Sequence, residues 1–215
     1  MKNKFIWSLP TKLNHNVCGS TDTLSFVGGA GDFDTNGKIR NPGDINAQIA
    51  GTVENISIAL SQENCTLADA VRLKVFYIPS DICDEITLLK ALQEVFPKEP
   101  SPVVSTLPVL LQPFQGQGIQ IQVIASRGWR TKNDFQFESQ ILETPGDVPS
   151  LRPDVTTALR AGEFIAVSNR TAAHFKADFD MSLDGPGQSH IIMPSLQKSL
   201  NTLGASLQDS IKMEG

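Results

Sequence analysis

The sequence predicts an α+β fold in which a mixed sheet carries two helices on one face, followed by a second, shorter α/β segment. Apolar residues recur with helical spacing in two segments of the first 125 residues, and they alternate with polar residues in others. The predicted order is strand, strand, helix, strand, helix, strand, strand, which favours a sheet covered by helices on one side. After residue 153 a similar pattern starts again.

The first predicted strand, residues 21–29, ends in glycines. Residues 31–44 are rich in Gly, Asp, Asn and Pro, a composition typical of a loop. A helix is predicted next, because apolar residues follow one another at spacings of four, four, three and four: Ile45, Ile49, Val53, Ile56 and Leu60. This helix should end near Glu63–Asn64. Alternating residues in 70–78 predict a strand whose last part is more deeply buried.

A second helix is predicted after this strand. Ser80 or Asp81 is its expected N-cap, and acidic residues in the first turn suit the positive end of the helix dipole. Pro97 should end the helix. Its expected buried residues are Ile86, Leu89, Val95 and Phe96. Two more strands are predicted over 103–111 and 119–125.

Composition limits the classes of function. The net charge is −5, and no cluster of Lys and Arg offers the basic face that a nucleic acid requires, so we expect no nucleic-acid partner. The three cysteines and three histidines have no metal-ligand spacing, and we expect no metal. Sparse cysteines of odd number indicate reduced thiols and a cytoplasmic protein. The N-terminal apolar run is too short for a signal peptide or a membrane helix, so no membrane partner is expected.

The second half resembles the first at a constant separation of 140 residues. Residues 163–171 correspond to the strand at 23–31, and residues 184–215 correspond to 44–75, with five identical positions. Pro194 lies within the second helical pattern and should kink or shorten that helix. We therefore predict a first module over 1–128, a turn-rich connector over 129–153 and a partial second module over 154–215.

Four segments carry a resemblance to a known family. They are SFVGGAGD (25–32), GDINAQIAGTVENISIALSQENCTLADAVRLKVFYIPS (43–80), PVVS (102–105) and IQIQVIA (119–125). Together they resemble the RidA (YjgF-type) enamine/imine deaminases over about residues 1–128. The resemblance implies a RidA-like (chorismate-mutase-like) module, and barrel-like trimers with a ligand pocket between modules. It also implies cofactor-free hydrolysis of small enamines and imines such as 2-aminoacrylate to a keto acid and ammonia.

The resemblance also places the site residues. It puts substrate-binding groups at Gly28 and Gly29, and at Ser105 in PVVS. The arginine that binds the substrate carboxylate in the family falls on Val104, and an acidic residue falls on Gln120, so both of these functional groups are lost. A valine cannot form the charge-assisted hydrogen bonds of a guanidinium.

In the second half, Ser168 takes the position where the first half has Gly28, and Arg170 could supply a positive charge. Three functions stay open: imine hydrolysis, non-catalytic binding of a small metabolite that is expected to be a carboxylate, and RNA cleavage, which the acidic charge disfavours. A half module would leave apolar surface bare, so we expect a longer tandem chain or a homo-oligomer, either a trimer or a pseudo-trimer of modules.

Overall fold

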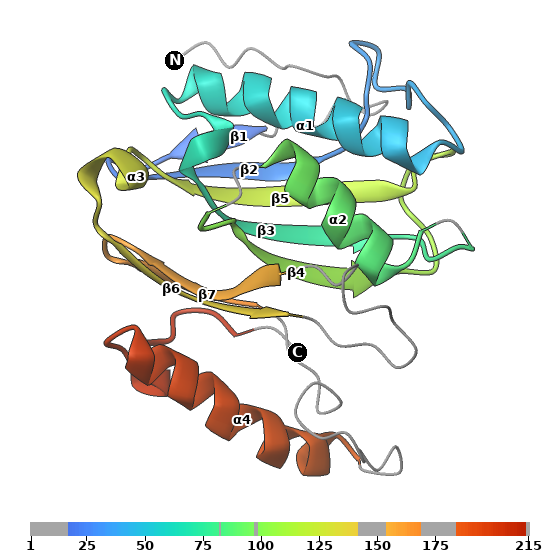
Figure 1. Cartoon of the computed structure of the whole chain (residues 1–215). Helices are drawn as coiled ribbons and strands as arrows, with labels where there is room; N and C mark the ends of the chain where they lie inside the picture. The colour runs from blue at the N-terminus through green and yellow to red at the C-terminus, as the bar shows by residue number, and fades with distance from the viewer. Residues whose placement is uncertain (1–16, 82, 97–98, 142–153, 169–183, 214–215) are drawn as a thin grey trace.

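The computed structural model describes residues 17–81, 83–96, 99–141, 154–168 and 184–213. Its first unit is a five-stranded sheet in the order β1-β2-β5-β3-β4, with β3 and β4 parallel and the other neighbours antiparallel (Figure 1). The strands are β1 (Cys18–Ser20), β2 (Leu24–Ala30), β3 (Ala70–Tyr77), β4 (Val103–Pro108) and β5 (Ile119–Ser126). The predicted mixed sheet is thus confirmed, although β4 ends three residues before the predicted limit.

Two helices cover one face of this sheet, as predicted: α1 (Ile45–Gln62) and α2 (Glu85–Val95) (Figure 1). The Asp44 side chain caps α1 by accepting a hydrogen bond from the Ala47 amide at 3.0 Å. The main hydrophobic core lies between the helices and the sheet and includes Ile49, Val53, Ile56, Leu60, Leu73, Val75, Leu88, Leu92, Ile119, Ile121 and Val123. The predicted apolar stripe of α1 is confirmed.

The start of α2 differs from the prediction. Asp84, rather than Ser80 or Asp81, is the N-cap, because its carboxylate accepts a hydrogen bond from the Thr87 amide at 2.7 Å. Ser80 instead forms two backbone hydrogen bonds with Cys83, which hold the chain in a turn before the helix. The later start changes the buried stripe: Leu88, Leu89 and Leu92 are buried together with Phe96, whereas Ile86 and Val95 are only partly buried.

The predicted turn-rich connector is wrong for residues 129–141. This segment forms the short helix α3 (Trp129–Lys132) and the strand β6 (Phe135–Ile141). Its polar residues suggested a turn, but Phe135 and Phe137 alternate with them at the spacing of a strand. Strand β6 begins a second, antiparallel sheet, β6-β7-β8, with β7 (Asp154–Ala161) and β8 (Phe164–Val167).

The second sheet packs on the first through a small hydrophobic cluster. Its buried members are Val71 and Val103 from the first sheet, Trp129 from α3, and Leu159, Ala161 and Ala166 from the second sheet. The Trp129 indole N–H donates a hydrogen bond to the Asp69 carbonyl at 3.2 Å, and its ring meets Phe135 edge to face at 5.2 Å between centroids. This tryptophan therefore links the two sheets.

Helix α4 (Gly185–Thr202) follows the second sheet and is followed by a single 3-10 turn at Leu207–Asp209. The helix runs through Pro194 and is as long as α1, so the predicted shortening is wrong. Both elements lie 140 positions after α1 and the 3-10 turn at Leu67–Asp69, and they have the same lengths. No helix in the described ranges has the length and apolar character needed to cross a membrane.

Candidate functional site

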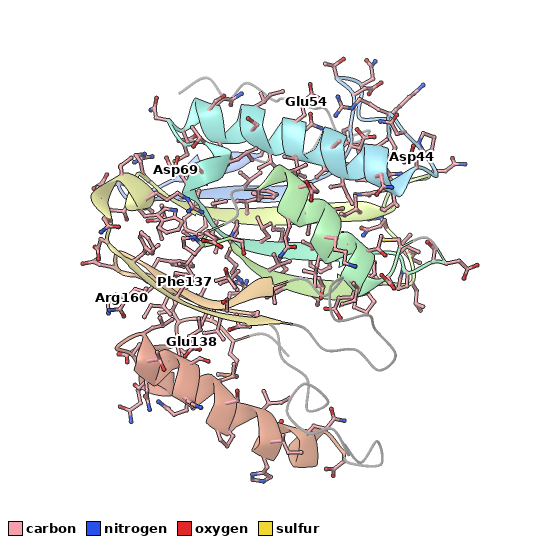
Figure 2. All side chains as sticks on the ribbon, viewed as in Figure 1. Asp44, Glu54, Asp69, Phe137, Glu138 and Arg160 are labelled. Atoms are coloured by element: carbon pink, nitrogen blue, oxygen red, sulfur yellow. The ribbon has the colours of Figure 1, made fainter. Side chains whose placement is uncertain are left out.

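The open face of the five-stranded sheet is the face opposite α1 and α2, and it carries the candidate site. Leu73 and Val75 of β3 point into the core, so Lys74 and Phe76 lie on the open face. The Lys74 ammonium lies 5.0 Å from the centroid of the Phe76 ring, within cation–π range. In Figure 2, side chains fill the space between this face, at β3 and β4, and the second sheet.

The structure brings two of the predicted site residues together. A Cβ atom added to Gly29 would lie 2.6 Å from Cδ of Gln120, so the Gln120 side chain occupies the space directly over this glycine. At Gly28 the nearest atom to such a Cβ is the Val17 carbonyl oxygen at 3.6 Å, an ordinary contact. The missing side chain at Gly29 thus makes room for the Gln120 amide, whereas no side chain occupies the corresponding space at Gly28.

Val104 and Ser105 are separated by the sheet. Val104 pairs with Leu73 and packs against the main core on the helix side. Ser105 pairs with Lys74 and lies on the same face as Val103, which packs against the second sheet, so Ser105 is buried at 4% exposed. Val104 and Ser105, which the family pattern places side by side, therefore face opposite sides of the sheet.

Of the two predicted residues of the second half, the structure describes only Ser168. Ser168 follows β8, and its backbone N–H donates to the Thr157 carbonyl at 2.8 Å. Arg170 lies outside the described residues. The suggestion that Arg170 supplies the missing positive charge therefore stays a prediction.

A row of polar residues across three strands was missed by the sequence reasoning. Ser105 of β4 pairs with Lys74 of β3, and Lys74 pairs with Gln122 of β5. Neighbouring strands lie about 4.8 Å apart, so the hydroxyl, ammonium and amide form one contiguous polar strip. In the next row Phe76 pairs with Gln120. The alternation of residues 70–78 placed Lys74 on the exposed side, but only strand pairing identifies its neighbours.

The described strand residues of this face offer groups that can bind a ligand. Among the described residues of β2, β3, β4 and β5, none on this face is Asp, Glu or His. Lys74 supplies a positive charge, and Gln120 and Gln122 supply amide donors and acceptors. In the ranges that the structure describes, no group of His, Cys, Asp or Glu is arranged to hold a metal.

Tyr77 and Cys83, near the end of β3, stay neutral at pH 7 because their pKa values are raised. Burial raises the pKa of Tyr77, and the nearby Glu85 carboxylate raises it further. Burial also raises the pKa of the Cys83 thiol, with a smaller contribution from Asp84. A thiol that resists ionisation is a poor nucleophile, so Cys83 is a packing residue.

Comparisons with known proteins agree with this fold. A candidate endoribonuclease from Thermotoga maritima is 20% identical, with 58% of this chain and 94% of that chain covered and a TM-score of 0.50. A YjgF/YER057c/UK114 family member from Mycobacterium tuberculosis is 25% identical, with 54% and 90% covered and a TM-score of 0.45. E. coli TdcF, solved with bound serine, is 19% identical, with 58% of this chain and 96% of that chain covered and a TM-score of 0.48.

A comparison with the curated proteins finds no match. The family model described as endoribonuclease L-PSP matches residues 10–127, a segment that includes all five strands of the first sheet and both of its helices. Because this match spans more than half of the sequence, the chain belongs to the endoribonuclease L-PSP family, which is also known as the YjgF or RidA family.

Proposed function

We propose that the chain binds a small carboxylate metabolite on the open face without hydrolysing an imine there. The observation that carries this proposal is the polar strip of Ser105, Lys74 and Gln122, which contains one cation and no acidic group. A carboxylate would accept hydrogen bonds from the Lys74 ammonium, which is partly exposed, and from the Gln122 amide, which is exposed. Water activation by a carboxylate has no counterpart on this face among the described residues.

The test is a titration of the full chain with pyruvate, followed by 1H–15N NMR. Lys74→Met should weaken binding about tenfold, because a hydrogen bond to a charged group contributes about 1.5 kcal/mol at a partly exposed site. Lys198→Met removes the same charge from the exposed side of α4 and is the matched control. Equal affinities of the two variants would refute the assignment.

Imine hydrolysis is the second candidate, supported by family membership alone. The assay measures keto-acid and ammonia release from freshly generated 2-aminoacrylate. We expect release at the rate of the spontaneous reaction, with no dependence on protein concentration. A proportional increase with protein would show that the amides of Gln120 and Gln122 suffice, and would replace the binding proposal. RNA cleavage is disfavoured by the net charge of −5.

We also propose that residues 154–215 are a partial second module. Two capping interactions support this at a separation of 140 residues. The Asp44 carboxylate accepts from the Ala47 amide, and Asp184 accepts from Gly187. In the same way the Thr66 amide donates to Asp69, and the Ser206 amide donates to Asp209, both at 2.8 Å.

A trimer or pseudo-trimer of modules is the proposed assembly. The two sheets of this chain already pack against each other through the cluster around Trp129. Light scattering coupled to size exclusion gives the mass directly. A mass equal to that of one chain at all concentrations would refute the proposed assembly of several chains.

A further inference from the structure

Strand β8 has an outer edge, on the side away from β7, that pairs with no strand among the described residues. The Ser168 N–H points inward, since it donates to the Thr157 carbonyl at 2.8 Å. Backbone groups alternate along a strand, so the N–H and carbonyl groups of Val167 and Ile165 point outward. Within the described part of the chain, this edge offers a template for another strand.

The first sheet contains the same edge in a paired state. The Gly28 N–H donates to the Val17 carbonyl at 2.9 Å, and these residues lie 140 positions before Ser168 and Thr157. The outer edge of β2 at this point is occupied by β5, with Val27 opposite Val123. Strand β5 therefore shows what kind of segment fits the corresponding edge of β8.

Helix α4 has a surface that the described residues leave only partly covered. Helix α1 buries nine residues under the sheet that includes β5, whereas α4 has the same length and buries only Ser199 among its described side chains. Its apolar residues stay partly exposed: Ile191, Ile192, Met193, Leu196 and Leu200. Helix α4 contacts β8, so the partly exposed helix and the open edge belong to one surface.

A glutamine on each helix identifies the approach to this edge. The Gln48 amide of α1 donates to the Gly116 carbonyl at 2.9 Å and accepts from the Gly118 N–H at 2.7 Å. It thereby fixes the turn that leads into β5. Gln188 is the residue 140 positions later, on the first turn of α4, where it is partly exposed.

We propose that the edge of β8, together with α4 and Gln188, binds a β-strand of a partner protein with the chemistry of β5. That strand follows a glycine-containing turn, which Gln188 holds, and it presents branched apolar side chains at alternate positions to α4. It pairs antiparallel with Phe164–Val167. This inference rests on the proposed second module, and it adds the binding site that such a module would present.

The test uses the full chain and a synthetic peptide with the sequence of residues 115–127, QGQGIQIQVIASR. Hydrogen–deuterium exchange should slow at least fivefold in the segment containing Ile165 and Val167 when the peptide is added. A peptide with serine at the positions of Ile119, Ile121 and Val123 should give no protection. Protection by both peptides, or by neither, would overturn the proposal.

A variant pair separates specific binding from loss of folding. Gln188→Ala should weaken peptide binding about tenfold, because the turn loses its hydrogen bonds to the amide. Gln208→Ala, at an exposed position of the following 3-10 turn, should leave binding unchanged. Equal effects of the two changes would exclude the assigned role of Gln188.

Two further measurements identify the alternatives. Protection of β8 that grows with protein concentration in the absence of peptide would assign the edge to a second copy of this chain, and would overturn the partner assignment. Pyruvate binding is measured in the same samples. Intact pyruvate binding without peptide binding would refute this inference alone, whereas the reverse result would refute only the carboxylate site.

Discussion

Replacement of Gln48 by methionine tests the link between α1 and the sheet. The Gln48 side chain is 1% exposed and forms three hydrogen bonds, to the Asn41 and Gly116 carbonyls at 2.9 Å each and from the Gly118 amide at 2.7 Å. Methionine has nearly the same shape, so Gln48→Met removes the hydrogen bonds without opening a large cavity. The change therefore isolates the polar contribution.

The expected cost follows from these three hydrogen bonds. Each neutral hydrogen bond contributes about 1 kcal/mol net, so the free energy of unfolding should fall by about 3 kcal/mol. Gly116 is exposed, and its carbonyl can bind water after the substitution, which keeps the cost from rising further. In a chain of this size the melting temperature should fall by about 2–4 °C per kcal/mol.

Urea unfolding followed by circular dichroism measures this change. Gln188→Met is the control, because the equivalent residue of α4 is partly exposed and should contribute less than about 1 kcal/mol. If Gln48→Met also costs less than about 1 kcal/mol, then Gln48 does not hold the two loops together. The comparison of Gln48 with Gln188 would then lose its basis.

Three further changes test other contacts. Gly29→Ala should displace Gln120 and weaken pyruvate binding. Gly28→Ala has room and should change the free energy of unfolding by less than about 1 kcal/mol. Equal pyruvate affinity of the two variants would refute the close contact between Gly29 and Gln120. Burial, aided by a nearby carboxylate, raises the pKa of Cys18 from 9.0 to about 11, so the free energy of unfolding should fall as pH rises from about 9 to 11, and a flat profile would contradict this. Leu159→Ala, at a fully buried position between the sheets, should cost about 3 kcal/mol in urea unfolding, and a loss below about 1 kcal/mol would contradict the packing of the two sheets.

Local chemistry allowed most elements of the first sheet to be predicted. The spacing of Ile45, Ile49 and Val53 defines α1, and the alternation around Val75 defines β3. The N-cap of α2 was missed because Ser80, Asp81 and Asp84 all have capping side chains, and only the backbone turn to Cys83 decides among them. Such a turn depends on contacts that sequence spacing does not reveal.

The candidate site was only partly predictable, because it depends on which strands are neighbours. The family pattern pointed to Val104 and Ser105 as adjacent positions, yet adjacent residues of a strand face opposite sides of the sheet. Lys74 and Gln122 are 48 positions apart and become neighbours only through the pairing of β3 with β5. The closeness of Gly29 and Gln120 likewise depends on β2 lying beside β5.

Helices α1 and α4 show how far local sequence alone determines structure. Both have 18 residues, both start after a capping aspartate, and both lead into a 3-10 turn with a capping box. Their burial differs greatly, so it cannot come from these shared local signals. It comes from the elements packed against α1, which include β2, β5 and α2; of these, β5 pairs with β2 and has no described equivalent beside β8. If a strand were bound to the edge of β8, the apolar residues of α4 should become buried while the helix keeps its limits. The peptide experiment therefore separates the local signals that define the helix from the tertiary contacts that bury it.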